Sequence, residues 1–200
     1  MAEMIHQFIQ WGGAAALFGL IFAETGLLAG FFLPGDSLLL TAGLIAASGA
    51  ALNIGWLIPL LCAAAIIGDS VGYAIGFHWG PRIFNREDSR FFHKDHLTRT
   101  QRFYEKHGPK TIVLARFVPF VRTFAPTVAG AGRMHYRTFL FYNVAGGVGW
   151  VCSMTLGGYF LGRAVPNIES YLHLVVASVI FLSLVPIGWE WRASRRRNAS

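Results

Sequence analysis

Charged side chains are scarce in this 200-residue chain, where 17 Lys and Arg and 10 Asp and Glu make up only 14% of the residues. No Lys or Arg occurs between Glu3 and Arg82, and no Asp or Glu occurs between Thr111 and Gly162. Soluble domains carry nearer a quarter of charged residues. The scarcity excludes an ordinary soluble domain. The net charge of +7 comes from a central loop and a tail between long apolar runs. Because the excess of basic residues is not spread over solvated faces, it does not indicate a nucleic-acid-binding protein either.

Cysteine and the common catalytic motifs are also lacking. Cys62 and Cys152 stand in separate apolar stretches without CxxC spacing, so we expect free thiols rather than a disulfide or zinc site. The chain has no P-loop, no dinucleotide-binding glycine fingerprint and no nucleophile elbow. His93, Asp95 and His96 crowd the start of a predicted helix and cannot easily converge on one metal ion. We therefore expect no cofactor, no metal and no enzyme activity.

Long apolar runs are what the chain has instead. A helix needs roughly 20 apolar residues to cross a hydrocarbon core about 30 Å thick. We expect the first run to stay in the mature chain and not to be a cleaved signal, because no Lys or Arg precedes it and Glu24 lies inside it. We predict an all-α integral membrane protein with about four transmembrane helices, approximately at Phe8–Phe31, Trp56–Trp79, Phe139–Gly162 and Ser170–Trp189.

Two shorter apolar runs are broken by proline and contain charged residues. Leu33–Ala47 is broken by Pro34-Gly35, and Ile112–Gly132 is broken by Pro119 and Pro126. Irregular backbone at membrane depth is tolerated only where protein or water satisfies its polar groups. We therefore predict two re-entrant helical segments that face an interior cavity.

The two halves of the chain resemble each other. Pro34 followed by Thr41-Ala42-Gly43 matches Pro119 followed by Val128-Ala129-Gly130, and Gly72-Tyr73-x-x-Gly76 matches Gly158-Tyr159-x-x-Gly162. Such repeats are typical of transporters built from inverted halves with opposed broken helices. The prediction is one polytopic domain over 1–200, with repeat one at about 8–80, a loop at 81–110, repeat two at about 111–163, a final span at 170–189 and a tail at 190–200.

Basic residues predict the orientation. The loop at 81–110 holds eight Lys and Arg against four acids and a predicted amphipathic helix over His96–His107, and the tail holds Arg195-Arg196-Arg197. Short basic segments stay on the cytoplasmic side of a membrane. Both termini are therefore predicted to be cytoplasmic.

Seven charges fall within the apolar segments, and at roughly 2.5–3.5 kcal/mol each they cannot all face lipid. Arg133 and Arg137 stand at a segment end, where their side chains can reach the interface. The others either pair with one another to hold the halves together or form a polar cavity, with guanidinium groups for an anion and carboxylates for protons. They are Glu24, Asp36, Asp69, Arg116 and Arg122.

Four motifs in this order resemble the DedA family of bacterial inner-membrane proteins: Glu24, Phe32-Leu33-Pro34-Gly35-Asp36, Gly68-Asp69-x-x-Gly72-Tyr73-x-x-Gly76 and Arg116-Phe117-x-Pro119-x-x-Arg122. The resemblance implies opposed re-entrant helices and transport that depends on the proton motive force. It implies proton coupling through Glu24 and Asp36, with Asp69 in a glycine–aspartate motif, and phosphate binding by Arg116 and Arg122. The motif residues Pro34, Gly35, Gly68, Gly72, Tyr73, Gly76 and Pro119 are expected to be structural, and the glycines favour close helix packing.

Three functions remain open. The first is a transporter or flippase for a polyprenyl phosphate, which the resemblance identifies as undecaprenyl phosphate, or for another phospholipid. The second is a proton-coupled antiporter of small cations or drugs. The third, a membrane lipid phosphatase, ranks last because the membrane segments offer neither a histidine beside Asp36 nor a metal-ligand cluster. The expected partners are the bilayer, the anionic lipid and protons, with no nucleic acid, and the sequence allows a homo-oligomer.

Overall fold

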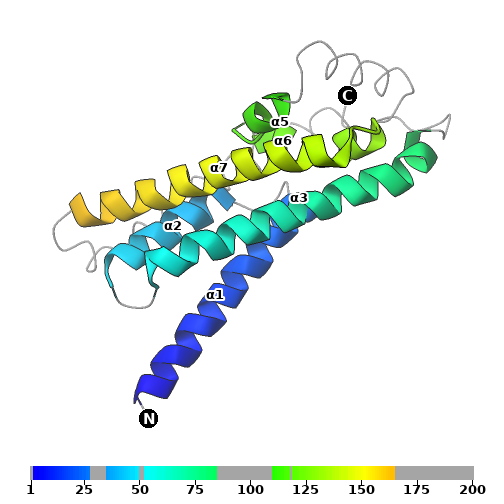
Figure 1. Ribbon diagram of the computed structural model, residues 1–200. Coiled ribbons are helices and arrows are strands. Elements are labelled where there is room, and N and C mark those ends of the chain that lie inside the picture. Colours follow the sequence, from blue (N-terminus) through cyan, green and yellow to red (C-terminus); the bar gives the residue numbers. More distant parts are fainter. Residues whose placement is uncertain (1, 28–34, 50–51, 85–109, 118, 165–200) are drawn as a thin grey trace, which may run out of the picture. The chain divides into compact units, whose positions relative to one another are not determined.

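A computed structural model of the protein describes residues 2–27, 35–49, 52–84, 110–117 and 119–164. All regular secondary structure in these residues is helical, which confirms the prediction of an all-α chain (Figure 1). The helices are α1 (Ala2–Gly26), α2 (Gly35–Ala47), α3 (Ile54–Phe84), α5 (Lys110–Ala115), α6 (Pro119–Ala131) and α7 (Tyr136–Ala164).

Two of the described helices are long and apolar enough to cross a membrane. They run over Ile54–Gly80 in α3 and Tyr136–Ala164 in α7, and they contain the spans predicted at Trp56–Trp79 and Phe139–Gly162. The apolar part of α1, Gly12–Gly26, is shorter than a full span. The predicted final span and the predicted amphipathic helix lie outside the described residues, so four spans remain a prediction.

The two proline-broken segments form short helices. Helices α2 and α6 have 13 residues each, which at about 1.5 Å per residue rise only about 20 Å and cannot cross the hydrocarbon core alone. The second segment breaks in a turn at Arg116-Phe117, after α5 and before Pro119. Pro119 opens α6, where its missing N–H costs no helical hydrogen bond. Pro126, by contrast, lies inside α6 and does not end it as the sequence had suggested. The re-entrant path itself stays a prediction.

The described helices divide between two compact units. One unit contains α2 and the C-terminal end of α7, together with the starts of α1 and α3. The other contains the end of α1, most of α3, all of α5 and α6, and the N-terminal part of α7. Each unit therefore holds one of the short helices beside part of a long one.

In the second unit α6 packs against α3 through glycine. A Cβ on Gly130 would overlap the carbonyl oxygen of Tyr73 and lie 2.8 Å from the amide nitrogen of Phe77. Likewise, a Cβ on Gly76 would overlap the carbonyl oxygen of Thr127. The backbones can approach this closely only because both positions lack side chains.

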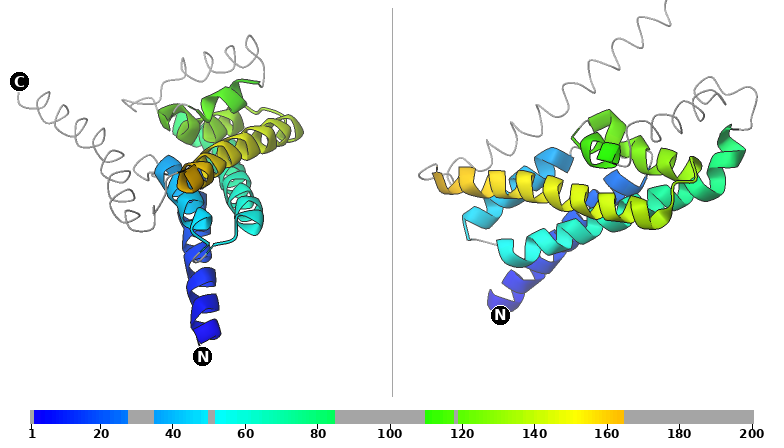
Figure 2. Two further views of the ribbon diagram at one scale, coloured as in Figure 1. Left: turned by 90° about the vertical axis from the view of Figure 1, so that its left-hand side faces the viewer. Right: turned by 45° about the horizontal axis from the view of Figure 1, so that its top comes forward.

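In the first unit α2 lies beside α7 (Figure 2), and the two helices pack through glycine in the same way. A Cβ on Gly43 would overlap the carbonyl oxygen of Thr155 and lie 2.8 Å from the amide nitrogen of Tyr159, and a Cβ on Gly158 would overlap the carbonyl oxygen of Leu40. By these contacts Gly43 corresponds to Gly130, as the sequence repeat predicts.

The register of the long helices differs from the predicted one. Gly158 takes the place of Gly76 in these contacts, and Gly162, which meets Ala47, takes the place of Gly80, which meets Ala131. The sequence match had instead paired Gly158 with Gly72. The error arises because Gly72-Tyr73-x-x-Gly76 is followed at once by the similar run Gly76-Phe77-x-x-Gly80. Packing selects the second run, one helical turn later.

We expect Gly130→Ala to destabilise the protein, because its methyl group would push into the backbone of Tyr73. Overpacking of this kind costs about 1–3 kcal/mol, or roughly 2–4 °C in the midpoint of thermal unfolding for each kcal/mol in a chain of this size. The matched control is Gly149→Ala on α7, where a Cβ meets nothing within 4 Å. Because Ala favours helix over Gly, the control should unfold at the same temperature or higher. Equal midpoints for the two variants in detergent would contradict the close packing.

Candidate functional site

The end of α1 crosses α3 at two glycines, beside two of the three acids that the sequence singled out. Gly26 and Gly68 meet at the crossing, where a Cβ on Gly26 would lie 2.9 Å from the carbonyl oxygen of Gly68. A Cβ on Gly68 would overlap the hydroxyl of Thr25. Glu24 and Asp69 flank this crossing in the sequence, so the close approach of the two backbones sets where both carboxylates lie.

Each acid forms an ion pair with one arginine of the second predicted repeat. Arg116, in the turn between α5 and α6, donates from Nη2 to Asp69 Oδ2, and Arg122 in α6 donates from Nη2 to Glu24 Oε1. All four side chains are shielded, with exposed fractions from 2% for Glu24 to 11% for Arg122. The pairs join residues that are far apart in the sequence.

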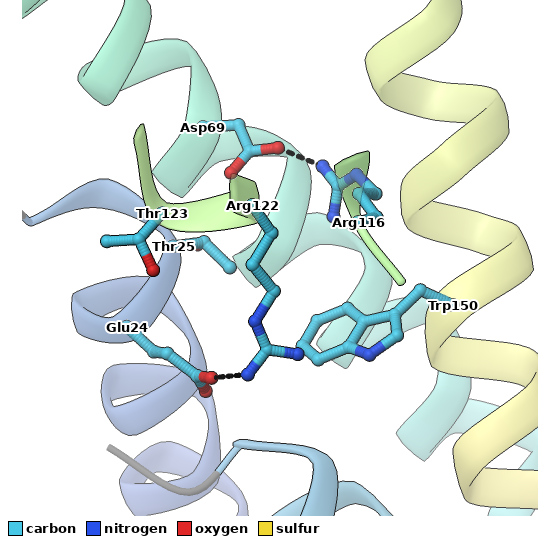
Figure 3. Close-up of a pocket in the computed structure, with 7 residues that line it drawn as sticks. All are labelled: Glu24, Thr25, Asp69, Arg116, Arg122, Thr123 and Trp150. Carbon is cyan, nitrogen blue, oxygen red and sulfur yellow. Dashed lines mark hydrogen bonds and ion pairs between the residues drawn. The ribbon is translucent and has the colours of Figure 1, made fainter. Parts of the chain in front are cut away.

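The two ion pairs line one pocket, which Figure 3 shows with its surrounding helices. The pocket has about 240 Å³ of empty space, part of it open to the surroundings. The guanidinium of Arg122 lies between the carboxylate of Glu24 and the ring of Trp150 (Figure 3). The lining residues all belong to one compact unit and are Glu24, Thr25, Asp69, Arg116, Arg122, Thr123 and Trp150.

The formal charges in the pocket cancel, because two carboxylates face two guanidinium groups. A buried charge without a partner is costly, and removing one member of a buried pair typically costs about 3–5 kcal/mol. The structural interpretation of these residues requires such pairs. The same pairs also create a polar cavity with two fixed cations and two groups that can bind protons, which the functional interpretation requires.

Asp36 belongs to the other compact unit, in the first turn of α2, where it is half-buried. Gly35 begins α2 and is buried, while Pro34 lies outside the described residues. Pro119 is the first residue of α6. Gly72 packs against Pro126 of α6, where a Cβ on the glycine would lie 3.4 Å from the Cβ of the proline.

Tyr73 and the two outer arginines lie away from the ion pairs in their contacts. Tyr73 is buried against Phe139 and donates its hydroxyl hydrogen to the carbonyl oxygen of Met134. Arg133 is exposed, has a left-handed φ of 56° after the end of α6, and stacks on Phe77 with its guanidinium carbon 4.5 Å from the ring centroid. Arg137 is exposed as well. These positions fit arginines that reach an interface.

Two residues that hold the arginines were not singled out from the sequence. Asn143 accepts a hydrogen bond from Arg116 Nη2, and Trp150 stacks on Arg122. Both are completely or almost completely buried in α7. An amide within an apolar span is a signal of helix–helix hydrogen bonding, and a tryptophan in mid-span departs from the usual place of tryptophan at the membrane interface. Either signal could have indicated them.

In the described part of the chain, no three His, Cys, Asp or Glu side chains gather closely enough to hold a metal ion. The cluster of His93, Asp95 and His96 lies outside the described residues.

Comparisons with known proteins identify the family. The VTT domain matches residues 33–160, which include both short helices and the arginine motif. Protein DedA of Escherichia coli (strain K12) is 46% identical over 187 residues, covering 93% of this chain and 84% of the relative. The chain belongs to the DedA family. Its relatives also include an uncharacterized membrane protein of Mycobacterium tuberculosis, 45% identical over 186 residues (88% of this chain and 81% of the relative).

A more distant DedA relative is the inner membrane protein YqjA of Escherichia coli, 34% identical over 169 residues, which cover 84% of this chain and 76% of the relative. No solved structure matches the chain significantly. Family membership and the apolar helices together make this chain a membrane protein of the DedA family.

Proposed function

We propose that this DedA-family protein is a transporter of the bacterial inner membrane that moves an anionic lipid phosphate together with protons. Undecaprenyl phosphate is the substrate that the family resemblance implies. The observation that carries the proposal is the pocket in which two shielded arginines each pair with a buried acid. The proposal places both termini in the cytoplasm.

Arginine suits a phosphate ligand because its guanidinium stays charged and donates two hydrogen bonds in one plane. In the described state the carboxylate oxygens of Asp69 and Glu24 occupy donor positions of Arg116 and Arg122. Carboxylate and phosphate oxygens present the same chemistry to a guanidinium. The substrate phosphate therefore competes with the protein's own acids for the same donors.

Protons decide this competition. A carboxylate that binds a proton loses its charge and most of its attraction to the arginine, which then needs another anion. Proton binding therefore raises the affinity of the site for phosphate, and phosphate binding raises its affinity for protons by the same factor. Release of both protons on the far side of the membrane restores the ion pairs and expels the phosphate. This exchange couples transport to a proton gradient without any further group.

The size of the pocket limits what it can recognise. In the described state the paired side chains fill most of the pocket, whereas pockets that enclose drug-sized ligands hold roughly 300–1,000 Å³. A phosphate head group would enter only where an acid gives up its arginine, and a polyprenyl tail has to remain among lipid chains and apolar helix faces. The site therefore selects the head group and places few demands on the tail.

The arrangement argues against the two alternative functions. A cation or drug substrate would have to displace an arginine from each acid. The displaced guanidinium group would then lie inside the protein without its counter-charge, which is energetically costly. A phosphatase would need an activated nucleophile, and the described residues that line the pocket include the hydroxyls of Thr25 and Thr123 but no histidine to activate them.

The test is flux into proteoliposomes that contain the purified protein and carry an imposed pH gradient. We expect labelled undecaprenyl phosphate to change leaflet in the direction set by the gradient and the neutral alcohol undecaprenol to show no protein-dependent movement. The unequal distribution of the lipid between the leaflets should disappear when the gradient is dissipated. Gradient-driven movement of a cationic dye without movement of the lipid phosphate would contradict the proposal and favour the antiporter. Release of inorganic phosphate would favour the phosphatase.

A further inference from the structure

One face of α7 contacts both arginines of the pocket. Asn143, Gly146, Gly147 and Trp150 follow one another at the i, i+3, i+4 and i+7 spacing that lines one side of a helix. All four are buried. The residues between them are exposed, namely Val144, Ala145, Val148 and Gly149. We call these four buried residues the α7 face.

Asn143 and the two glycines hold Arg116. The Asn143 side chain accepts a hydrogen bond from Arg116 Nη2 and donates one from Nδ2 to the carbonyl oxygen of Ile66 at 3.1 Å, so both ends of the amide are used. A Cβ on Gly146 would lie 2.9 Å from Arg116 Cδ, and a Cβ on Gly147 would lie 3.5 Å from Arg116 Cζ. The absence of side chains there leaves a flat surface against which the arginine lies.

Trp150 holds Arg122. The guanidinium carbon of Arg122 lies 4.8 Å from the centroid of the Trp150 ring, and only 1% of the tryptophan is exposed. Figure 3 shows the ring and Glu24 on opposite sides of the guanidinium. A cation over a desolvated indole ring is attracted by its electron-rich face. Arg122 therefore contacts both a charged group, the carboxylate of Glu24, and an uncharged group of the α7 face, the Trp150 ring.

The contacts of the α7 face differ from the ion pairs in their response to protons. An amide, two glycines and an indole carry no titratable proton, so their hold on the arginines does not change when an acid becomes neutral. Arg116 Nη2 carries two hydrogens, of which one goes to Asp69 and the other to Asn143. Loss of the acid therefore frees one donor while the amide still fixes the guanidinium.

We infer that the α7 face is the positioning surface that keeps both guanidinium groups in place while their acids are protonated, so that a phosphate finds two ordered donors. The role of this surface in phosphate binding rests on the proposed function, whereas its role in holding the two arginines does not. Asn143 and Trp150 are positioning residues. Gly146 and Gly147 give the guanidinium of Arg116 the room to lie flat.

A thermal double-mutant cycle tests the positioning without any transport measurement. Trp150→Leu should lower the unfolding midpoint more in a Glu24→Gln background than in the parent, because Arg122 then loses the indole ring as well as the charge of the carboxylate. The corresponding cycle pairs Asn143→Ala with Asp69→Asn. Residues that merely pack should give additive losses. Val148→Ala on the exposed side of α7 is the matched control and should be additive with Glu24→Gln. The inference would be overturned if the loss from Trp150→Leu were additive with that from Glu24→Gln, and the loss from Asn143→Ala additive with that from Asp69→Asn.

Transport kinetics give the second readout. Trp150→Leu is expected to raise the concentration of lipid phosphate needed for half-maximal flux by about tenfold, and Trp150→Phe, which keeps an aromatic face, should recover part of the loss. Equal half-saturation in Trp150→Leu and the parent would overturn the role in phosphate binding. Non-additive unfolding in a protein that moves no lipid phosphate would keep the positioning surface and reject the proposed function.

Discussion

Transport of lipid phosphate is expected to fall by about 100-fold or more when Arg122 is replaced by glutamine. A guanidinium group that binds phosphate donates two charge-assisted hydrogen bonds, and each contributes about 1.5–3 kcal/mol to the binding free energy. A loss of about 3 kcal/mol already lowers the affinity by more than 100-fold. Arg116→Gln should have a similar effect, because Arg116 is as deeply buried and as closely paired. The measurement is initial flux of labelled undecaprenyl phosphate at equal amounts of inserted protein.

A single neutral substitution also leaves an acid buried without its counter-charge, so the folded amount has to be controlled. The double variant Glu24→Gln with Arg122→Gln removes both charges of one pair and should restore much of the folded protein while transport stays lost. Arg137→Gln, at an exposed position outside the pocket, should transport like the parent. A double variant that folds and transports normally would show that the pair serves only to hold the helices together.

Lysine separates charge from geometry at the same positions. Arg122→Lys keeps a positive charge but loses the planar pair of donors. We expect an intermediate loss, of about tenfold, between the parent and the glutamine variant. Full activity of both lysine variants would exclude bidentate recognition of phosphate.

The second large effect concerns electrical charge. Two acids and two arginines make the empty pocket neutral. A phosphate monoester carries close to two negative charges above its second pKa of about 6. The pocket returns to neutrality only if both acids take up protons. We therefore expect two protons to move with each phosphate, so that the parent protein transports without net charge and responds to a pH gradient but not to a membrane potential.

Replacing Glu24 with glutamine removes one of these protons and should make transport carry one net negative charge. One elementary charge in a potential of 100 mV corresponds to about 2.3 kcal/mol, or about a 50-fold change in the equilibrium ratio of substrate between the leaflets. Valinomycin and potassium gradients set the potential at fixed pH, and labelled lipid reports the ratio. Asp69→Asn should behave alike, and Val148→Ala should behave like the parent. A parent protein that responds to potential as strongly as the Glu24 variant would contradict the two-proton exchange.

Much about this protein follows from its sequence alone. Apolar runs and scarce charge predict a helical membrane protein because unpaired backbone and free charges are too costly in hydrocarbon. Charged residues inside such runs need protein partners for the same reason, so Glu24, Asp69, Arg116 and Arg122 stand out without any coordinates. The motifs around them indicate the DedA family, which the comparisons confirm.

Only the tertiary structure decided which charges meet and what else holds them. The charge pattern does not predict the pairs, because Coulomb attraction would favour Glu24 with Arg116 as much as with Arg122. The glycine crossing of α1 and α3 and the turn before α6 place Glu24 against Arg122. The same holds for the α7 face, since Asn143 and Trp150 are meaningful only through what lies opposite them. Register is the clearest case: two overlapping glycine–aromatic runs are equivalent along the chain, and backbone packing at Gly76 and Gly80 selects between them because only one choice fits the carbonyl groups of the neighbouring helix.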